Sequence, residues 1–467
     1  MKRTALLIIA GLALVLPSCV KSFLTLTPPS QATADDFYKT TEDINNAVTA
    51  AYSALRSGSM YTGHFIYLME VRSDNIEDQN PGANAGMNYN IDRFLALADN
   101  GVVQDAYAAL YAAISRCNNT LAHIDVVTDT ALKRRYEGEL RFLRGLHYFQ
   151  VVRLWGAAPL VLAPVSTEAS KNIGRSPAAD VYAAIEADLQ AAAGLLPPVY
   201  TSNPDIGRAT AGAAKALLAK VYLTERKYQE AAGILKELVP PGNNPFHYRL
   251  LDSVADVFDV NNKMNDEIIF AIRYDKTIPG QGHNLLFGNP VLDPRLLDAY
   301  ESTDTRRDLL NTVQLNANNF QVKKYYDTFD PNSQTTGNDF IILRYADVLL
   351  MYAEVLNEIA YSNDPGGDAF KYLNMVRSRA SATPFTPAQL TDQASFRAAV
   401  LRERRLELPL ELQRWFDLVR TETAIAALQS SGLTPITIQP YQYLYPVPQG
   451  QIEAMNNPAL YPQNPGY

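Results

Sequence analysis

No residue pattern in the chain carries an enzymatic signature. The histidines fall at unrelated spacings and include no HExxH pair or other metal-ligand pattern; they are His64, His123, His147, His247 and His283. The chain also lacks a GxSxG elbow and a P-loop. Asp and Glu together number 49, so chance carboxylate pairs are common and a glycosidase pair stays open without specific support. We therefore predict a protein that is not an enzyme and has no cofactor.

The densest charge cluster lies near the C-terminus. It comprises residues 401–407, Arg414, Asp417 and Arg420. Such a cluster can bind an anion, or its members can form ion pairs at three- and four-residue spacing that lock a helix against its neighbours. Because acidic and basic residues are nearly balanced here, the structural interpretation is favoured. Arg344 and Asp347 are expected to form ion pairs of the same kind.

Oxygen donors stand at alternate positions in the segment 78–84. Asp78, Asn80, Gly82 and Asn84 faintly resemble the start of a calcium loop. The closing Glu is missing at the expected distance. A solvated turn is therefore favoured, and no metal site is predicted.

The first 18 residues have the layout of a secretory signal peptide. Lys2 and Arg3 precede an apolar run, residues 5–16, which is shorter than the roughly 20 residues of a membrane span. The next residues, Leu16-Pro17-Ser18-Cys19, resemble a bacterial lipobox, in which lipid is attached to the cysteine. We predict that Cys19 is lipidated and anchors the mature chain to a membrane. The alternative is an ordinary signal peptide with an incidental cysteine.

Charge and cysteine content restrict the partners of the mature chain. Without Lys2 and Arg3 it holds 39 basic and 49 acidic residues, a net charge of −10. This balance argues against nucleic acid and against charge-driven binding to anionic lipid. Only Cys117 remains after Cys19, so an intramolecular disulfide is excluded. Cys117 is expected to be a small buried hydrophobe, and His147, on an apolar helical stripe, a hydrogen-bonded core histidine.

The mature chain is divided into parts that differ in their periodicity. These are a lipid-anchored lead (19–40), a helical region (41–242) with a polar ligand loop (57–102), a loop-rich insertion (243–340), and a C-terminal helical region with an irregular tail (341–467). Thr40 and Asp43 are placed to cap the first helix. Further helices are predicted at 103–127, 131–155 and 177–196.

Residues 208–239 read as two helices joined at Glu225-Arg226-Lys227 and resemble a tetratricopeptide repeat. Such a pair cannot bury its apolar face alone, so we expect other pairs to stack on it: 103–127 with 131–155, and 341–360 with 367–380. In the insertion, 267–274 and 321–326 are predicted as short β-strands. Pro409 should kink or break the last helix, 396–421. The predicted fold is mainly α: tetratricopeptide-like helix pairs in a right-handed scaffold, with a loop-rich insertion carrying short strands.

Several segments together resemble one family, the SusD/RagB nutrient-binding lipoproteins. They are the start Cys19…Phe23-Leu24 with Asp36-Phe37-Tyr38, the helix and turn of residues 141–149 and 153–161 (RFLRGLHYF, RLWGAAPLV), residues 344–354 (RYADVLLMYAE), residues 373–380 (LNMVRSRA), residues 403–408 and 413–418 (ERRLEL, QRWFDL), and the ending 463–467 (QNPGY). The resemblance spans the mature chain, in the family's order and spacing. Pro409 and Leu412 depart from the family pattern.

The resemblance implies a specific function. Members of this family resemble a tetratricopeptide scaffold that caps a SusC-like TonB-dependent transporter in the outer membrane, at the cell surface. They capture glycans, or in some branches peptides, for import, and loops outside the helical repeats carry the ligand site. We therefore expect this chain to bind nutrient glycans for such a transporter. The alternatives are a peptide binder and a scaffold that only assembles envelope proteins.

A sugar site needs flat aromatic faces and short polar groups. Trp155 and Trp415 both fall in helical motifs, so tyrosine and phenylalanine must supply the faces. The candidate ligand residues come from two loop regions that the resemblance implies converge. They are Asp74, Asn75, Asn88 and Tyr89 from the first region, and Tyr274, Asn284 and Phe287 from the second.

Overall fold

A computed structural model describes the protein from residue 37 to residue 467, apart from residues 284–289, 316–319, 329 and 331–334. Cys19, Asn284 and Phe287 lie outside the described residues. Within residue 37 onward, apart from those gaps, no helix is long and apolar enough to cross a membrane.

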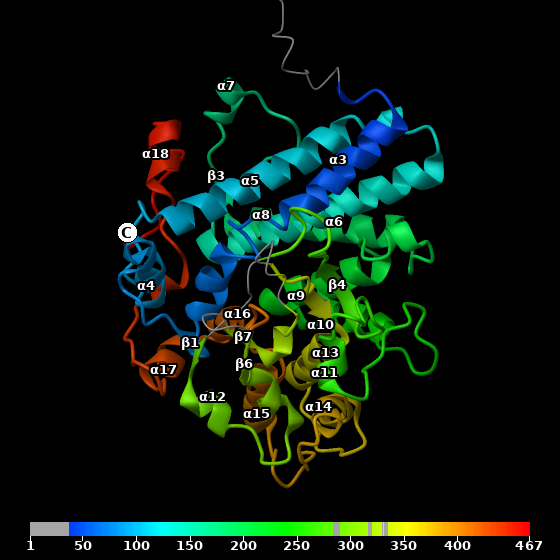
Figure 1. Cartoon of the computed structure of the whole chain (residues 1–467), viewed down its shortest axis with the longest axis vertical. Coiled ribbons are helices and arrows are strands. Elements are labelled where there is room, and N and C mark those ends of the chain that lie inside the picture. The colour runs from blue at the N-terminus through cyan, green and yellow to red at the C-terminus, as the bar shows by residue number, and fades with distance from the viewer. Residues whose placement is uncertain (1–36, 284–289, 316–319, 329, 331–334) are drawn as a thin grey trace, which may run out of the picture.

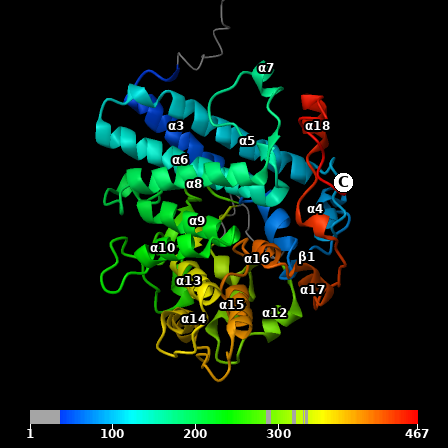
Figure 2. The ribbon, with the colours of Figure 1, turned by 180° about the vertical axis from the view of Figure 1, so that it is seen from behind.

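The body is a stack of helices in which each packs on the next along the chain (Figures 1 and 2). They are α3 (Thr41–Ala54), α5 (Gly101–Ala122), α6 (Thr130–Trp155), α8 (Ala178–Leu195), α9 (Ala211–Thr224), α10 (Tyr228–Leu238), α13 (Tyr345–Ile359), α14 (Asp368–Arg379) and α15 (Gln393–Glu407). Thr40 and Asp43 form the expected capping box at the start of α3. The predicted pairs α5/α6, α9/α10 and α13/α14 are each in contact, which confirms the mainly α fold of stacked helix pairs.

Two glycines let α6 and α8 approach closely. A Cβ at Gly145 would stand 3.1 Å from the Leu189 side chain, and one at Gly138 would stand 2.8 Å from Leu196. Both glycines lie inside a helix, where glycine costs roughly 0.5–1 kcal/mol relative to alanine. Close packing of the two helices is the reason that the sequence accepts this cost.

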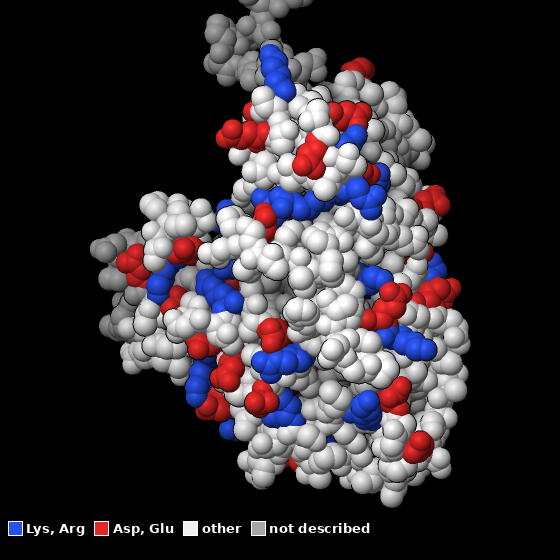
Figure 3. Space-filling view, turned by 90° about the vertical axis from the view of Figure 1, so that its right-hand side faces the viewer, with Lys and Arg blue, Asp and Glu red and all other residues white. Residues whose placement is uncertain are grey.

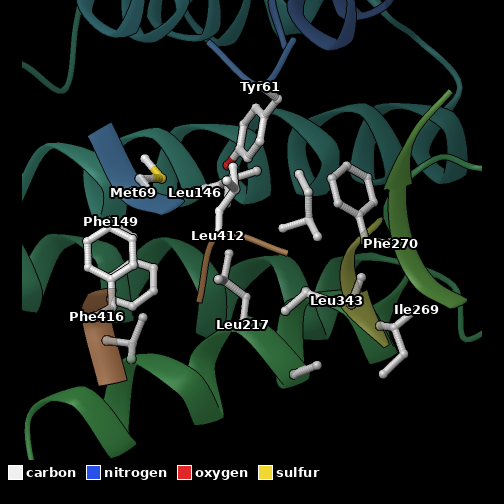
Figure 4. Packing of buried hydrophobic residues seen from close by; sticks show 14 of the residues in the cluster. Tyr61, Met69, Leu146, Phe149, Leu217, Ile269, Phe270, Leu343, Leu412 and Phe416 are labelled. Carbon is white, nitrogen blue, oxygen red and sulfur yellow. The ribbon is translucent and has the colours of Figure 1, made fainter. Parts of the chain in front are cut away.

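One hydrophobic core runs from α3 to the C-terminal segment. Figure 4 shows side chains of α6 (Leu146), α9 (Leu217), β4 (Phe270) and β8 (Leu343) packed together. Trp155 and Trp415 are fully buried, so neither offers a ring to a sugar, in agreement with the expectation that tyrosine and phenylalanine supply the aromatic faces.

Cys117 and His147 are both buried, as expected. Burial raises the pKa of the Cys117 thiol to about 12. The prediction that His147 is hydrogen-bonded is wrong, because neither of its ring nitrogens has a partner among the described residues. Burial, with a smaller contribution from Arg116, lowers the pKa of His147 to about 3, so the ring is neutral.

The strands are short and form four antiparallel pairs in the described part of the chain. They are β1 (Ile76–Glu77) with β5 (Val291–Leu292), β2 (Ala158–Pro159) with β3 (Arg175–Ser176), β4 (Ile268–Ile272) with β8 (Phe340–Arg344), and β6 (Thr312–Gln314) with β7 (Phe320–Val322). β4 and β7 confirm the two runs predicted as strands, although residues 323–325 turn into a short 3-10 helix. β4 is buried at every position, since both of its faces are covered.

The charge cluster near the C-terminus is structural, as predicted. Glu403 pairs with Arg306 and Arg377 at 2.6 and 2.7 Å, and Arg404 pairs with Asp347 and Asp417 at 2.8 Å each. The Arg344 guanidinium contacts carboxylates of Glu267, Glu407 and Glu411 at 2.5–3.0 Å. All of these side chains are buried. The network joins β4, β8, α13 and α15 into one unit.

The chain breaks after α15, as Pro409 predicted, and resumes in α16 (Arg414–Arg420). Leu410 and Leu412 in this break have φ values of 65° and 59°, a conformation that is uncommon outside glycine. Their amides, described below, hold a buried carboxylate, which accounts for the unusual backbone.

The prediction that residues 57–102 form a polar loop is wrong in part. The segment contains a π-helix (Ile66–Val71) and α4 (Met87–Asp92) besides its turns. The segment is rich in glycine, asparagine and aspartate, which indicated a loop. Phe65, Leu68 and Met69 nevertheless fit into the core, and their burial stabilises the helical turns.

On the face shown in Figure 3, acidic and basic side chains are interspersed, apart from a row of Lys and Arg side chains near the top.

Candidate functional site

The two predicted ligand regions meet at the β1–β5 pair. Ile76 is opposite Leu292 and Glu77 is opposite Val291, although some 215 residues of chain separate them. Beside this pair lies a cavity of about 670 Å³, which we call the loop pocket. Its walls come from the π-helix and the preceding turn, from β1 and the turn after it, from α4, and from Pro290 and Val291.

Among the described residues, the lining of the loop pocket combines the Tyr67 ring with several polar groups. Tyr67, on the π-helix, is half-buried in its wall, and burial raises the pKa of its phenol. Asn88 lies in α4 and accepts a hydrogen bond from Asn84 at 3.2 Å. Asp78 and Asn80 form the rim. Tyr67 was not among the sequence candidates. The apolar run from Phe65 to Met69, inside a polar segment, could have pointed to it.

The turn at 78–84 is held by its own side chains. Asp78 Oδ1 accepts a bond from the Asn80 amide at 2.8 Å, and Asn80 Oδ1 accepts bonds from the amides of Gly82 and Ala83 at 3.2 and 3.1 Å. These are the self-bonded turns that Asp and Asn favour. The oxygen atoms therefore serve the turn, in agreement with the interpretation of this segment as a solvated turn.

A buried carboxylate fixes the base of the loop pocket. Glu70 accepts bonds from Asn75 Nδ2 and from the amides of Leu410 and Leu412, each at 2.9 Å. Burial raises the pKa of Glu70, while these three donors act in the opposite direction. The unusual backbone after α15 is thus required to bring two amides to one carboxylate. This arrangement ties the π-helix to the break between α15 and α16.

Asp74 and Asn75 lie beneath the pocket rather than in its lining. Asp74 accepts two bonds from Arg414, at 2.7 and 2.9 Å, and Arg405 donates to Asn75 Oδ1 at 3.0 Å. Burial opposes ionisation of Asp74, but Arg414 and Arg405 outweigh it and lower its pKa. Ligand contact by Asp74 and Asn75 stays a prediction; in the structure their polar groups bind the loop to α15 and α16.

A second group of charges centres on Glu77 of β1, which also lines the loop pocket. Glu77 pairs with Arg93 and accepts bonds from the Thr434 amide and hydroxyl at 3.0 Å each. Burial raises the pKa of Glu77, but Thr434 and Arg93 outweigh it and the net shift is downward. In contrast, burial raises the pKa of nearby Asp92 to about 7, because Arg93 only partly offsets it. Asp92 Oδ2 accepts the Asp78 amide at 3.3 Å.

Asn88, Tyr89 and Tyr274, the other sequence candidates among the described residues, are not gathered in one place. Asn88 lines the loop pocket, whereas Tyr89 faces Arg93, whose guanidinium carbon is 5.2 Å from the ring centre. Tyr274 is buried and lines a different cavity, of about 620 Å³, between α3 and the segment that follows β4. We call this cavity the α3–β4 cleft. The positions of Asn284 and Phe287 lie outside the described residues, so their role stays a prediction.

Comparison with known proteins identifies the relatives of the chain. A family model described as "SusD family" matches residues 304–467, and one described as "Starch-binding associating with outer membrane" matches residues 22–223. The chain is 30% identical to SusD-like protein P25 of Formosa agariphila, over 95% of each chain. It is 28% identical to SusD-like protein P2 of the same organism, over 98% of each chain.

Solved structures of SusD-like and glycan-binding proteins have the same fold as this chain. A laminarin-binding SusD-like protein has a TM-score of 0.77 and 26% identity to this chain, and the alignment covers 92% of this chain and 100% of that one. Surface glycan-binding protein A of Bacteroides uniformis has a TM-score of 0.76 and 25% identity, with 91% and 99% covered. The names of these two proteins describe binding and no catalysis.

Proposed function

The chain belongs to the SusD family of binding proteins, and from this premise we propose that it captures a glycan in the loop pocket and leaves it chemically unchanged. The glycan then passes to a SusC-like TonB-dependent transporter. Lipid on Cys19 anchors the protein to the outer membrane at the cell surface.

The observation that carries the proposal is the convergence of two distant chain segments on one cavity. β1 and β5 bring residues 76–77 and 291–292 together, and the resulting pocket of about 670 Å³ lies within the size range of small-ligand sites. Loops positioned by a rigid scaffold are where binding residues concentrate. Here the scaffold is the helix stack and its buried ion pairs.

The lining suits a sugar ring. The Tyr67 ring supplies an apolar face for the C–H side of a pyranose, and its phenol can bond to a hydroxyl. The Asn88 amide can donate and accept, and the Asp78 carboxylate, which uses Oδ1 for its turn, can accept a hydroxyl at Oδ2. Among the described residues, the Tyr67 ring is the face on which one sugar residue can stack, while polar groups hold its neighbours.

Calorimetric titration of the purified full chain tests the proposal. The panel holds neutral oligosaccharides, including laminarihexaose, and short peptides. We expect saturable binding of a glycan, weakened roughly 10-fold by Tyr67→Ala, because the ring contributes about 1–2 kcal/mol of contact. Tyr441→Ala is the matched control, since Tyr441 is 40% exposed and does not line the loop pocket.

The variants separate the possible sites. Weakening by Tyr89→Ala, with Tyr67→Ala silent, would move the site to the outer side of α4 and refute the loop pocket as the ligand site. Binding of peptides alone would replace the glycan by a peptide ligand. Release of shortened sugars during long incubation with the ligand would contradict a purely binding function.

A further inference from the structure

The α3–β4 cleft differs from the loop pocket in its charge. Of the residues that line it, five are basic and two are acidic; they are Arg56, Arg208, Lys263, Arg273 and Lys276 against Asp275 and Asp327. The chain as a whole has a net charge of −8. A basic cleft on an acidic protein is therefore a local feature that composition does not explain.

Most of these cations have carboxylate partners. Arg208 contacts Glu139 at 2.8 Å and Asp205 at 3.2 Å, and Lys276 contacts Asp327 at 2.8 Å. These pairs are locally compensated. They leave little free charge for a ligand.

Two further cations share one carboxylate. Asp339 contacts Lys263 at 3.1 Å and Arg273 at 2.8 Å. The Arg273 side chain is 41% exposed. Its Nη1 donates to the Ile206 carbonyl at 3.2 Å, so Nη2 is the nitrogen that remains for an anion in the cleft. Asp275, the other acidic residue of the lining, is half-buried and accepts a hydrogen bond from the Thr277 hydroxyl at 2.6 Å.

Arg56 is the exception in this set. Its guanidinium donates to Gln281 Oε1 at 2.9 Å and to Ser53 Oγ at 3.0 Å, and among the described residues it forms no ion pair. Both partners are neutral, and they hold the group at the cleft wall in a half-buried setting. A held guanidinium with neutral partners is well suited to bind an oxyanion through two parallel N–H bonds.

The cleft and the loop pocket lie on the two sides of one turn. Arg56 at the start of this turn lines the cleft, while Thr62 and Gly63 at its end line the loop pocket. The rim of the cleft carries Ile206 and Ile278, which are 40% and 44% exposed. Apolar rims of this kind suit the C–H faces of a ring next to a charged substituent.

From this arrangement we propose that the α3–β4 cleft is a second ligand site, which binds an acidic sugar residue of the glycan through Arg56 and Arg273. The inference rests on the glycan-binding function proposed above and narrows its ligand class to acidic glycans. The recognised group is an anionic oxygen, carried by a uronate carboxylate or by a sulfate ester.

The test is titration of the full chain with three oligosaccharides of matched length: neutral laminarihexaose, an oligogalacturonate and a sulfated oligosaccharide of carrageenan. We expect an acidic oligosaccharide to bind more tightly than the neutral one. Arg56→Gln, which keeps a hydrogen-bonding side chain and removes the charge, should weaken the acidic ligand roughly 10-fold or more. It should leave the neutral ligand unchanged.

Two further variants complete the experiment. Arg273→Gln changes an exposed side chain and should act in the same direction as Arg56→Gln, so the test does not depend on one variant's folding. Arg249→Gln removes an equal charge at an exposed position, 59% accessible, outside the cleft, and should have no effect. Comparison of the two acidic ligands shows whether carboxylate or sulfate is recognised.

The outcomes distinguish this inference from the proposed function. If neutral glycan binds and depends on Tyr67, while Arg56→Gln and Arg273→Gln change no ligand, the second site is refuted and the first stands. If the acidic ligands bind the two variants as tightly as the unmodified chain, the cleft is likewise refuted. If no glycan binds the unmodified chain, both proposals fail.

Discussion

Replacement of Asp92 by asparagine should make the stability of the protein less sensitive to pH. Burial raises the pKa of Asp92 from its ordinary value of 3.8 to about 7, so the folded state holds the Asp92 proton up to a pH of about 7. Between these values the folded state binds more protons than the unfolded state. Its free energy of unfolding therefore falls as the pH rises, by about 1.4 kcal/mol per unit. Asparagine has no proton to release and removes this slope.

The expected size follows from the two pKa values. Between pH 5 and pH 8, the stability of the unmodified chain falls only up to the folded pKa of about 7, that is, over about two pH units. Over this range the Asp92→Asn variant should therefore gain about 3 kcal/mol in free energy of unfolding relative to the unmodified chain. For a chain of this length, the melting temperature of the variant minus that of the unmodified chain should be roughly 3 °C higher at pH 8 than at pH 5. The bond from the Asp78 amide survives, because the asparagine oxygen also accepts.

Thermal unfolding at pH 5 and at pH 8 measures this difference. Other titrating groups act equally on both proteins and cancel. Asp252→Asn is the control, since Asp252 is exposed and should give the same difference at both pH values. A difference for Asp92→Asn that is constant from pH 5 to pH 8 would show that Asp92 is ionised throughout, and it would refute the argument from burial.

Two further predictions concern the framework. Arg414→Gln leaves the buried Asp74 carboxylate without its bidentate partner and should destabilise the protein by about 3–5 kcal/mol. The control Arg249→Gln, at an exposed ion pair, should cost at most about 1 kcal/mol. Denaturant unfolding measures both free energies, and equal effects would contradict a bracing role for Asp74. Gly145→Val should destabilise the protein by about 1–3 kcal/mol, because the new side chain would collide with α8. The control Gly194→Ala, whose Cβ has no neighbour within 4 Å, should stabilise the protein by about 0.5–1 kcal/mol. An unchanged stability of the Gly145→Val variant would refute the close packing of α6 on α8.

Local signals in the sequence were sufficient for most of the helices. The capping box at Thr40, the helical periodicity of 131–155 and the break at Pro409 each depend on neighbouring residues, and the structure agrees with all three. Balanced charges in 401–407 correctly predicted ion pairs. These features rest on spacings of three and four residues, which a sequence displays directly.

The periodicity of the sequence did not reveal one helical segment, because polar residues surround the short apolar run that packs into the core. Residues 66–71 form a π-helix although glycine, asparagine and aspartate surround them. The partners that stabilise this segment come from far away, since Glu70 is held by amides of Leu410 and Leu412. No window along the chain contains both ends of such a contact.

The candidate site divides in the same way. Composition and the family resemblance indicated two loop regions, and the structure brings 76–77 and 291–292 together. Which side chains face the cavity was decided only by tertiary contacts. Asp74 points inward because it binds Arg414, which lies 340 residues further along the chain. Tyr67 lines the pocket because the neighbouring residues of its helix occupy the core. The sequence determined the helices and the kind of protein, whereas the orientation of each polar group followed from charges and amides that only folding brings within bonding distance.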